Sequence, residues 1–207
     1  MKKIIAMTGL LFLAGCAEAQ TQTESIQTDV SKQASGQTDT AIFAGGCFWC
    51  IESDYEKLPG VIEAVSGYAG GSGVTPTYKN HTRYGYYEVV EVTYDTGLLS
   101  YDDLLDYFWV HVDPTDDGGQ FCDRGPSYRT AIFARPDQIE TAKASKANII
   151  KTKPFNADIV TPVLEAPKFY KAEEYHQDFY KKESSHYKRY RKGCRRDART
   201  EQLWGDR

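Results

Sequence analysis

Apolar and polar positions along residues 40–182 follow two periods, which predict strands mixed with helices. Residues 41–44 are a short apolar run ending at two glycines, and residues 86–94 alternate with a period of two, so both are predicted strands. Further strands are expected at 61–65, 127–134 and 158–163, and helices at 47–58, 101–112, 137–151 and 172–182. This order indicates an α/β fold of the α+β kind, in which helices cover a mixed β-sheet.

The first residues have the pattern of a secretion signal. Lys2 and Lys3 precede an apolar stretch over residues 4–13, which is too short to span a membrane as a helix. The sequence Leu-Ala-Gly-Cys follows directly and is similar to a bacterial lipoprotein signal, in which cleavage before Cys16 leaves that cysteine to carry the lipid. Residues 1–15 are therefore predicted to be removed; an ordinary secretory signal cut nearby is the alternative.

A tether is predicted between the signal and the fold. Residues 16–39 are rich in Gln, Thr and Ser and have too few apolar side chains to order themselves. The folded domain is expected at 40–207, with an irregular basic tail from about residue 183. The lipid would hold this domain outside the cytoplasm on a bacterial membrane; Ala17 after the lipidated cysteine favours the outer membrane on the periplasmic side.

The composition supports a folded domain and excludes two classes of protein. Of 207 residues, 41% are apolar, which rules out wholesale disorder. The formal net charge of −4 argues against a nucleic-acid binder, because such proteins are basic. The basic run Lys188–Arg199 is therefore interpreted as a solvated tail. The chain has five cysteines, which are too few for a protein held together mainly by disulfides.

Cys47 is the first candidate for chemistry. It leaves a predicted strand, follows Gly45 and Gly46, and begins a predicted helix. The free amides and the dipole of a helix start favour a thiolate, so we expect a lowered pKa for the Cys47 thiol. Phe48 and Trp49 cannot share its helical face and are expected to form an apolar wall beside it. The alternative is an unreactive cysteine among core aromatics.

Glu88 is the second candidate. On the strand at 86–94 it shares a face with Val90, Val92 and Tyr94, the more apolar face of that strand. A carboxyl group turned to the core has a raised pKa and stays protonated, so it can donate a proton. At the solvated end of the strand it would instead be an ordinary surface residue, and the pattern leaves both possibilities open.

Seven motifs, in order along residues 40–207, carry a family resemblance. They are Gly-Gly-Cys-Phe-Trp at 45–49, Gly-Tyr-Ala-Gly-Gly at 67–71, Pro-Thr-Tyr at 76–78, Glu88, Gln-Phe-Cys-Asp-Arg-Gly at 120–125, Tyr-Arg-Thr-Ala-Ile-Phe at 128–133 and Glu-Tyr-His-Gln at 174–177. Together they resemble the A-type peptide methionine sulfoxide reductases, which act on the S epimer. The resemblance implies a two-layer α/β sandwich around a mixed sheet.

The resemblance also implies catalytic roles for two residues. Cys47 matches the family nucleophile, whose thiolate attacks the sulfoxide sulfur and becomes a sulfenic acid when methionine leaves. Glu88 matches the acid that protonates the sulfoxide oxygen. No cofactor and no metal are implied; the substrates are oxidised proteins and free methionine sulfoxide, the electron donor is a thioredoxin-like protein, and a monomer is expected.

Five further residues match the substrate pocket of the family. Phe48 and Trp49 match the aromatic wall that holds the methyl group of the substrate. Tyr68 and Tyr128 match the two tyrosines that hydrogen-bond the sulfoxide oxygen, and Asp123 matches a polar residue of the same pocket.

A second cysteine is expected to resolve the sulfenic acid of Cys47 as a disulfide. Cys194 follows a glycine in the polar tail and can swing to the site, whereas Cys50 is close in sequence but must react without disturbing the aromatic wall. Cys194 is narrowly favoured, and exchange between the two remains open. Cys122 adjoins Asp123, and its side chain is expected to point away from the pocket.

Two other functions fit part of the pattern. A general thiol–disulfide oxidoreductase would use Cys47 and Cys50 as a Cys-x-x-Cys pair, but that function leaves Glu88 without a role. A zinc-binding module would use these two cysteines with Cys122 and Cys194, but the last two form no closely spaced pair, as zinc sites usually require.

Overall fold

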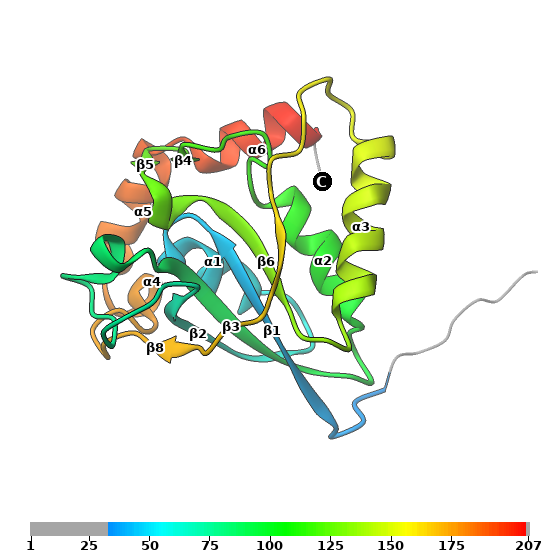
Figure 1. Ribbon diagram of the computed structural model, residues 1–207, viewed down its shortest axis with the longest axis horizontal. Coiled ribbons are helices and arrows are strands. Elements are labelled where there is room, and N and C mark those ends of the chain that lie inside the picture. Colours follow the sequence, from blue (N-terminus) through cyan, green and yellow to red (C-terminus); the bar gives the residue numbers. More distant parts are fainter. Residues whose placement is uncertain (1–32, 206–207) are drawn as a thin grey trace, which may run out of the picture. The chain divides into compact units, whose positions relative to one another are not determined.

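The computed structural model describes residues 33–205, and Figure 1 shows the remaining ones as a thin grey trace. The predicted signal, Cys16 and residues 17–32 of the predicted tether lie outside the described residues. Among residues 33–205, no helix has the length and apolar character needed to cross a membrane. The fold begins earlier than Thr40: Ser35 Oγ donates a hydrogen bond to Asp95 Oδ1 at 2.8 Å, and the first strand starts at Thr38.

A mixed sheet of six strands forms one layer, as expected. The strands are β1 (Thr38–Gly45), β2 (Val61–Ala69), β3 (Tyr87–Asp95), β6 (Thr130–Ala134), β7 (Val163–Glu165) and β8 (Tyr170–Lys171), in the spatial order β7-β6-β1-β3-β2-β8. All neighbours are antiparallel except β6 and β7, which are parallel. Two short strands, β4 (Gly119–Gln120) and β5 (Asp123–Arg124), pair as a separate hairpin.

Helices form the second layer (Figure 1). They are α1 (Phe48–Tyr55), α2 (Tyr101–Val110), α3 (Ile139–Thr152), α4 (Phe179–Lys182), α5 (Ser184–Gly193) and α6 (Arg196–Trp204), with 3₁₀ turns η1 (His81–Tyr84) and η2 (Pro126–Tyr128). The start of α2 has a capping box: Asp103 N–H donates to Ser100 Oγ, and Ser100 N–H donates to Asp103 Oδ2.

The main core lies between one face of the sheet and α1 to α3. Phe43 of β1 stacks on Tyr55 of α1 with ring centroids 5.1 Å apart, and Val90 and Val92 of β3 join the same cluster. A smaller cluster around Val89 covers the other face of the sheet. The even-numbered residues of β3, Glu88 among them, therefore point into the main core.

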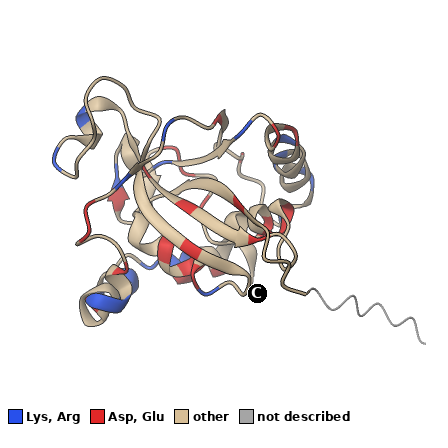
Figure 2. Cartoon of the chain, turned by 90° about the horizontal axis from the view of Figure 1, so that it is seen from below, with Lys and Arg blue, Asp and Glu red and all other residues tan. Residues whose placement is uncertain are grey.

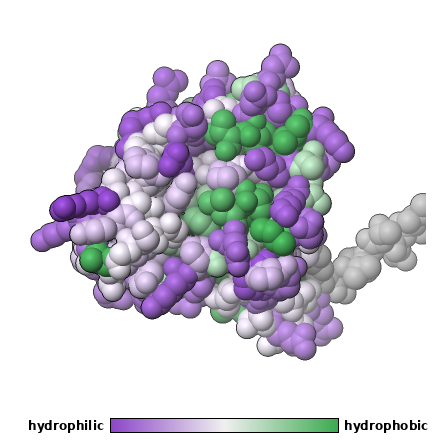
Figure 3. Space-filling model, viewed as in Figure 1, coloured by the Kyte–Doolittle hydropathy of each residue, from purple (hydrophilic) through white to green (hydrophobic). Residues whose placement is uncertain are grey.

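Figure 3 shows one side of the outer surface, where apolar patches are separated by hydrophilic side chains.

Two predicted elements are wrong, and both errors involve polar or proline residues. No strand spans residues 158–163: β7 begins only at Val163, after Pro162, which has no amide proton to give to a sheet. Most of the helix expected at 172–182 is absent, and only Phe179–Lys182 is α-helical. The amide side chain of Gln177 binds Ser66 N–H and the carbonyls of Ser66 and Ala172, so it ties this segment to β2.

The prediction of an irregular basic tail is also wrong, because α5 and α6 pack on the domain. Arg191 Nη1 lies 2.7 Å from Asp54 Oδ1 of α1. Arg196 is buried, with Nε 3.7 Å from Asp54 Oδ2 and Nη1 donating to Gly45 O at 3.1 Å. Arg199 pairs with the buried Asp113 at 2.7 Å. Figure 2 shows basic and acidic residues interspersed over the chain. The ion pairs of these three arginines explain how the basic segment of α5 and α6 docks on the rest of the domain.

We expect Asp54→Asn to lower the free energy of unfolding by about 3 kcal/mol, because it leaves the buried Arg196 guanidinium without its counter-charge. Denaturant unfolding followed by circular dichroism measures the change. Glu140→Gln is the matched control, since it removes an exposed ion pair with Lys143, which contributes at most about 1 kcal/mol. Equal effects of the two variants would show that the arginine network does not hold the C-terminal helices.

Candidate active site

Cys47 lies where β1 ends and α1 begins, as the sequence predicts. Gly46 has φ +88°, a left-handed conformation that favours glycine. A Cβ atom on Gly46 would lie 2.5 Å from Cβ of Gln120, so the backbone also passes too close for any side chain. The Cys47 side chain is 6% exposed and borders a cavity.

Glu88 lies directly beside this cysteine. Its Oε2 accepts a hydrogen bond from Phe48 N–H at 3.0 Å, and its side chain is almost fully buried. Burial raises the pKa of Glu88 to about 8, opposed by the Phe48 amide and the Tyr128 hydroxyl, which hydrogen-bond the carboxylate. His81 Nε2 is 3.7 Å away, but burial lowers its pKa, so it is neutral at pH 7. Of the two possibilities that the sequence left open, the structure has the core-facing carboxyl group, and its raised pKa favours the protonated form at pH 7.

The expectation of a lowered Cys47 pKa is wrong. Burial raises the pKa of the Cys47 thiol well above its ordinary value, and its hydrogen bond to Cys50 acts in the same direction. The pKa of Cys50 is lowered by that bond instead. The first free amide of the helix, Phe48 N–H, is used by Glu88, so the helix start acts on the carboxyl group rather than on the thiol.

A cavity of about 110 Å³ opens over these groups. It is lined by Cys47, Phe48, Trp49, Tyr78, Glu88, Asp123, Tyr128 and Tyr190. The structure thus brings together six of the residues expected to act on or bind the substrate. It adds two tyrosines that the sequence analysis did not assign, and it leaves out one that it did.

Tyr68 is the residue left out. Its hydroxyl donates to Glu173 Oε2 at 2.9 Å, and its side chain is buried behind Phe48 rather than lining the cavity. Tyr78 lies on the cavity instead. The sequence signal was present, because Tyr78 ends one of the motifs that carried the resemblance, but the tyrosine of the glycine-rich motif was given the role.

The Trp49 ring is held as a wall by its neighbours. It stacks on Phe179 with centroids 3.7 Å apart and an interplanar angle of 8°. Its Nε1–H donates to Nδ1 of the buried His176 at 3.1 Å. Tyr78 and the exposed Tyr175 both contact the His176 ring, at centroid distances of 4.6 and 4.2 Å, so an aromatic cluster surrounds this side of the cavity.

Tyr190 closes the opposite side from helix α5. Its hydroxyl donates to Asp123 Oδ2, and its ring meets Trp49 edge-on at 5.9 Å. It also hydrogen-bonds Cys47, which opposes the rise in the pKa of that thiol. No signal in the sequence pointed to Tyr190, because its segment was interpreted as a solvated tail.

The four cysteines among residues 33–205 form two separate pairs. Cys47 and Cys50 are free and buried, and their thiols share a hydrogen bond. Cys122 and Cys194 form a disulfide with Cα atoms 4.9 Å apart. The expected mobile thiol at Cys194 is therefore bonded elsewhere in this structure, and the arrangement contradicts a zinc site built from all four cysteines.

One carboxylate cluster has the spacing of a cation site, but its oxygens are already used. Glu52, Glu56 and Asp178 lie within reach of one another. Ser66 Oγ and Asp178 N–H donate to Glu52, and Lys181 lies 2.6 Å from Glu56. Burial raises the pKa of Glu52 to about 7. These contacts fasten α1 to β2 and α4, and the cluster has no part in the cavity.

Known proteins share both the sequence and the fold. The family model described as peptide methionine sulfoxide reductase matches residues 39–207. The chain is 51% identical to "Peptide methionine sulfoxide reductase MsrA 2" of Caulobacter vibrioides, over 83% of this chain and 88% of that protein. It is 46% identical to MsrA of Bacillus subtilis, over 83% of this chain and 98% of that protein.

Solved structures agree. Mxr1 of Saccharomyces cerevisiae in reduced form superposes with a TM-score of 0.65 at 30% identity, covering 72% of this chain and 88% of that one. Methionine sulfoxide reductase A of Corynebacterium diphtheriae gives the same TM-score and identity, covering 72% and 77%. The chain therefore belongs to the A-type peptide methionine sulfoxide reductase family, whose enzymes reduce methionine (S)-sulfoxide.

Proposed function

We propose that this enzyme reduces the sulfoxide in the cavity beside Cys47, with Glu88 as the general acid. The observation that carries the proposal is the meeting of a buried thiol with a carboxyl group whose pKa is raised to about 8. At pH 7 such a carboxyl group holds a proton that it can give away. A cavity of about 110 Å³ has room for a methyl sulfoxide group.

The reaction is an oxygen transfer to sulfur. Glu88 donates its proton to the sulfoxide oxygen while Cys47 Sγ attacks the sulfoxide sulfur. The substrate S–O bond and the transient bond between the two sulfurs then break as the oxygen bonds to Sγ. Methionine leaves, Cys47 carries the oxygen as a sulfenic acid, and the proton of the Cys47 thiol replaces the one that Glu88 gave. Phe48 and Trp49 hold the methyl group, and the Tyr128 hydroxyl is placed to hydrogen-bond the oxygen, with Tyr78 taking the place expected for Tyr68.

Cys50 is proposed as the resolving thiol in place of Cys194. Its sulfur hydrogen-bonds Cys47, and its lowered pKa favours the reactive thiolate. Attack on the sulfenic acid forms the Cys47–Cys50 disulfide and releases water. Cys194 is engaged with Cys122 and must be released before it can take part.

Turnover then needs a two-electron reductant. A thioredoxin-like dithiol protein is the proposed donor, because thiol–disulfide exchange reopens a protein disulfide. The yeast Mxr1 has been solved in complex with Trx2, with 24% identity to this chain and a TM-score of 0.50. Methionine sulfoxide, free or in oxidised proteins, is the proposed substrate, and protein repair is the proposed role.

The location is proposed from the sequence alone. Cys16 carries a lipid, and the domain is held outside the cytoplasm on a bacterial membrane. A tether from residue 17 to the start of the fold at Ser35 would reach roughly 20–25 Å, so the domain samples substrates near the membrane without lying on it.

We expect Glu88→Gln to slow single-turnover formation of methionine by about 10²–10⁴-fold at pH 7, because the amide cannot donate the proton. In the unaltered enzyme the rate should fall as the pH rises through about 8, where Glu88 ionises, and this alkaline limb should vanish in the variant. Glu91→Gln, on the opposite face of β3, is the matched control. Cys47→Ser lacks the nucleophile and gives the background rate. A Glu88→Gln rate like that of the control would remove the carboxyl group from the mechanism.

Peptide mapping after one turnover without reductant should reveal a Cys47–Cys50 disulfide. Cys50→Ser should instead leave a sulfenic acid on Cys47 that dimedone traps, since the neighbouring thiol is gone. The double variant Cys122→Ser/Cys194→Ser is the control and should still form the Cys47–Cys50 bond. Recovery of a Cys47–Cys194 peptide from the unaltered enzyme would return the resolving role to Cys194.

Cys16→Ser should convert a membrane-bound protein into one that fractionates with soluble material, because the lipid acceptor is lost. Metabolic labelling with a radioactive fatty acid, followed by membrane fractionation, measures both the lipid and the location. Ala17→Ser leaves the acceptor in place and serves as the control. If the unaltered protein takes up no label, the Leu-Ala-Gly-Cys motif is not a lipid signal in this chain.

A further inference from the structure

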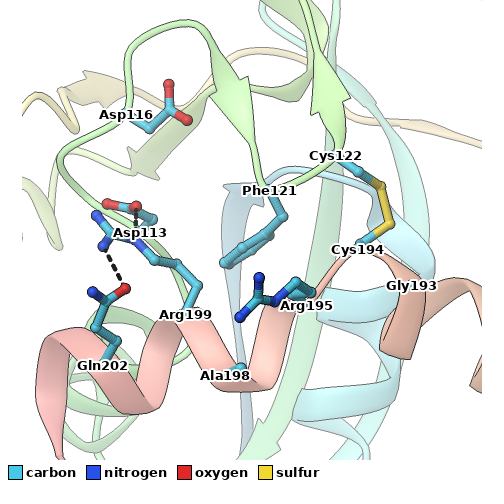
Figure 4. Close-up of a pocket in the computed structure, with 10 residues that line it drawn as sticks. All are labelled: Asp113, Asp116, Phe121, Cys122, Gly193, Cys194, Arg195, Ala198, Arg199 and Gln202. Carbon is cyan, nitrogen blue, oxygen red and sulfur yellow. Dashed lines mark hydrogen bonds and ion pairs between the residues drawn. A yellow bond between two sulfur atoms is a disulfide. The ribbon is translucent and has the colours of Figure 1, made fainter.

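The Cys122–Cys194 disulfide joins two segments that both reach the cavity. Figure 4 shows it bridging the segment that carries Cys122 to the helical segment at Cys194, residues 72 apart in sequence. Asp123, next to Cys122, lines the cavity. Tyr190 lies one helical turn before Cys194, whose N–H donates to Tyr190 O at 2.9 Å.

The same two segments meet a second time inside the cavity. Tyr190 donates its hydroxyl hydrogen to Asp123 Oδ2, so a hydrogen bond repeats the connection that the disulfide makes. The Tyr190 hydroxyl also hydrogen-bonds Cys47, and its ring contacts Trp49. The position of this one side chain therefore affects the part of the cavity wall that Cys47, Trp49 and Asp123 share.

The backbone on both sides of the bridge is strained. Phe121, before Cys122, has φ 55°, and Arg195, after Cys194, has φ 56°; both are left-handed conformations that non-glycine residues seldom adopt. The Arg196 guanidinium lies 4.6 Å from the centre of the Phe121 ring and packs the two segments together. Such conformations persist only where surrounding contacts hold them. The disulfide is the covalent link among the contacts that hold Phe121 and Arg195.

The bridge is open to solvent, unlike the reactive pair. Cys122 is exposed, and both half-cystines line a hollow of about 400 Å³ on the surface (Figure 4). Cys47 and Cys50 are buried. A dithiol reductant can therefore reach the bridge without entering the cavity.

We propose that the Cys122–Cys194 disulfide positions Tyr190 and Asp123 in the sulfoxide cavity, so that its redox state sets the affinity for substrate. The inference rests on the proposed binding of sulfoxide in this cavity. A dithiol reductant gives two electrons and two protons to the bridge, which opens to two thiols while the reductant becomes a disulfide. The strained residues then relax, Tyr190 leaves Asp123, and sulfoxide binds more weakly, whereas Cys47 and Glu88 stay in place.

Single-turnover kinetics over a range of methionine sulfoxide concentrations test this proposal. The double variant Cys122→Ser/Cys194→Ser should raise the half-saturating concentration about tenfold, because a hydrogen bond to a charged group is lost from the cavity wall, and should leave the maximal rate within about twofold. Tyr190→Phe should raise the half-saturating concentration by a similar factor. The triple variant that combines these changes should have a half-saturating concentration no higher than that of the worse of the two, because both changes break the same contact between Tyr190 and Asp123.

Controls separate this role from a general loss of stability. Tyr180→Phe also removes a tyrosine–carboxylate bond, that with Glu56, but neither residue lines the cavity, so both kinetic constants should be unchanged. Tm and circular dichroism verify folding of every variant. An unchanged half-saturating concentration in the double variant would overturn the proposal, as would fully additive effects in the triple variant. If the unaltered enzyme forms no methionine at any sulfoxide concentration, the proposed function itself is overturned.

Discussion

The hydrogen bond from Phe48 N–H to Glu88 is the contact on which the site depends. It joins the first turn of α1 to β3 directly beside Cys47, so the thiol, the acid and the helix start share one position. Because the carboxyl group is buried, its charged form is costly, and the amide reduces that cost only in part. The result is an acid that is half ionised near pH 8 and mostly protonated at pH 7.

The rest of the cavity is completed by the end of the chain. Tyr190 comes from α5 and the stacking partner of Trp49, Phe179, from α4. These helices are short, and α5 has a polar and basic sequence with a single buried side chain, Tyr187, so hydrophobic burial alone does not dock it. Ion pairs to Asp54 and the disulfide supply the attachment, which makes the substrate side of the site more dependent on charge and covalent bonds than the catalytic side.

This division explains what the sequence could predict. Cys47, Glu88 and the aromatic wall belong to regular elements whose periods are visible. The alternation along β3 puts Glu88 on the more apolar face, but only the structure shows that this face is buried at Glu88. The helices of the C-terminal segment carry no apolar stripe, since their contacts are arginines matched to carboxylates distant in sequence. For the same reason Tyr190 and the Cys122–Cys194 bond could not be found by pattern. The raised pKa of Cys47 also escaped prediction, because it depends first on the burial of the thiol and then on its hydrogen bond to Cys50, neither of which the sequence pattern shows.

The burial of the two free cysteines bears on the alternative function. A general thiol–disulfide oxidoreductase must present its attacking sulfur to a protein partner, whereas Cys47 and Cys50 are 6% and 2% exposed and open only to a small cavity. A methionine sulfoxide side chain can extend into that space; the disulfide of a folded protein cannot. The same geometry limits recycling, because a protein reductant can reach a Cys47–Cys50 bond only if the wall around it moves. Tyr190 is part of that wall: it hydrogen-bonds Cys47, and the helix that carries it is fastened at Cys194 by the solvent-accessible disulfide.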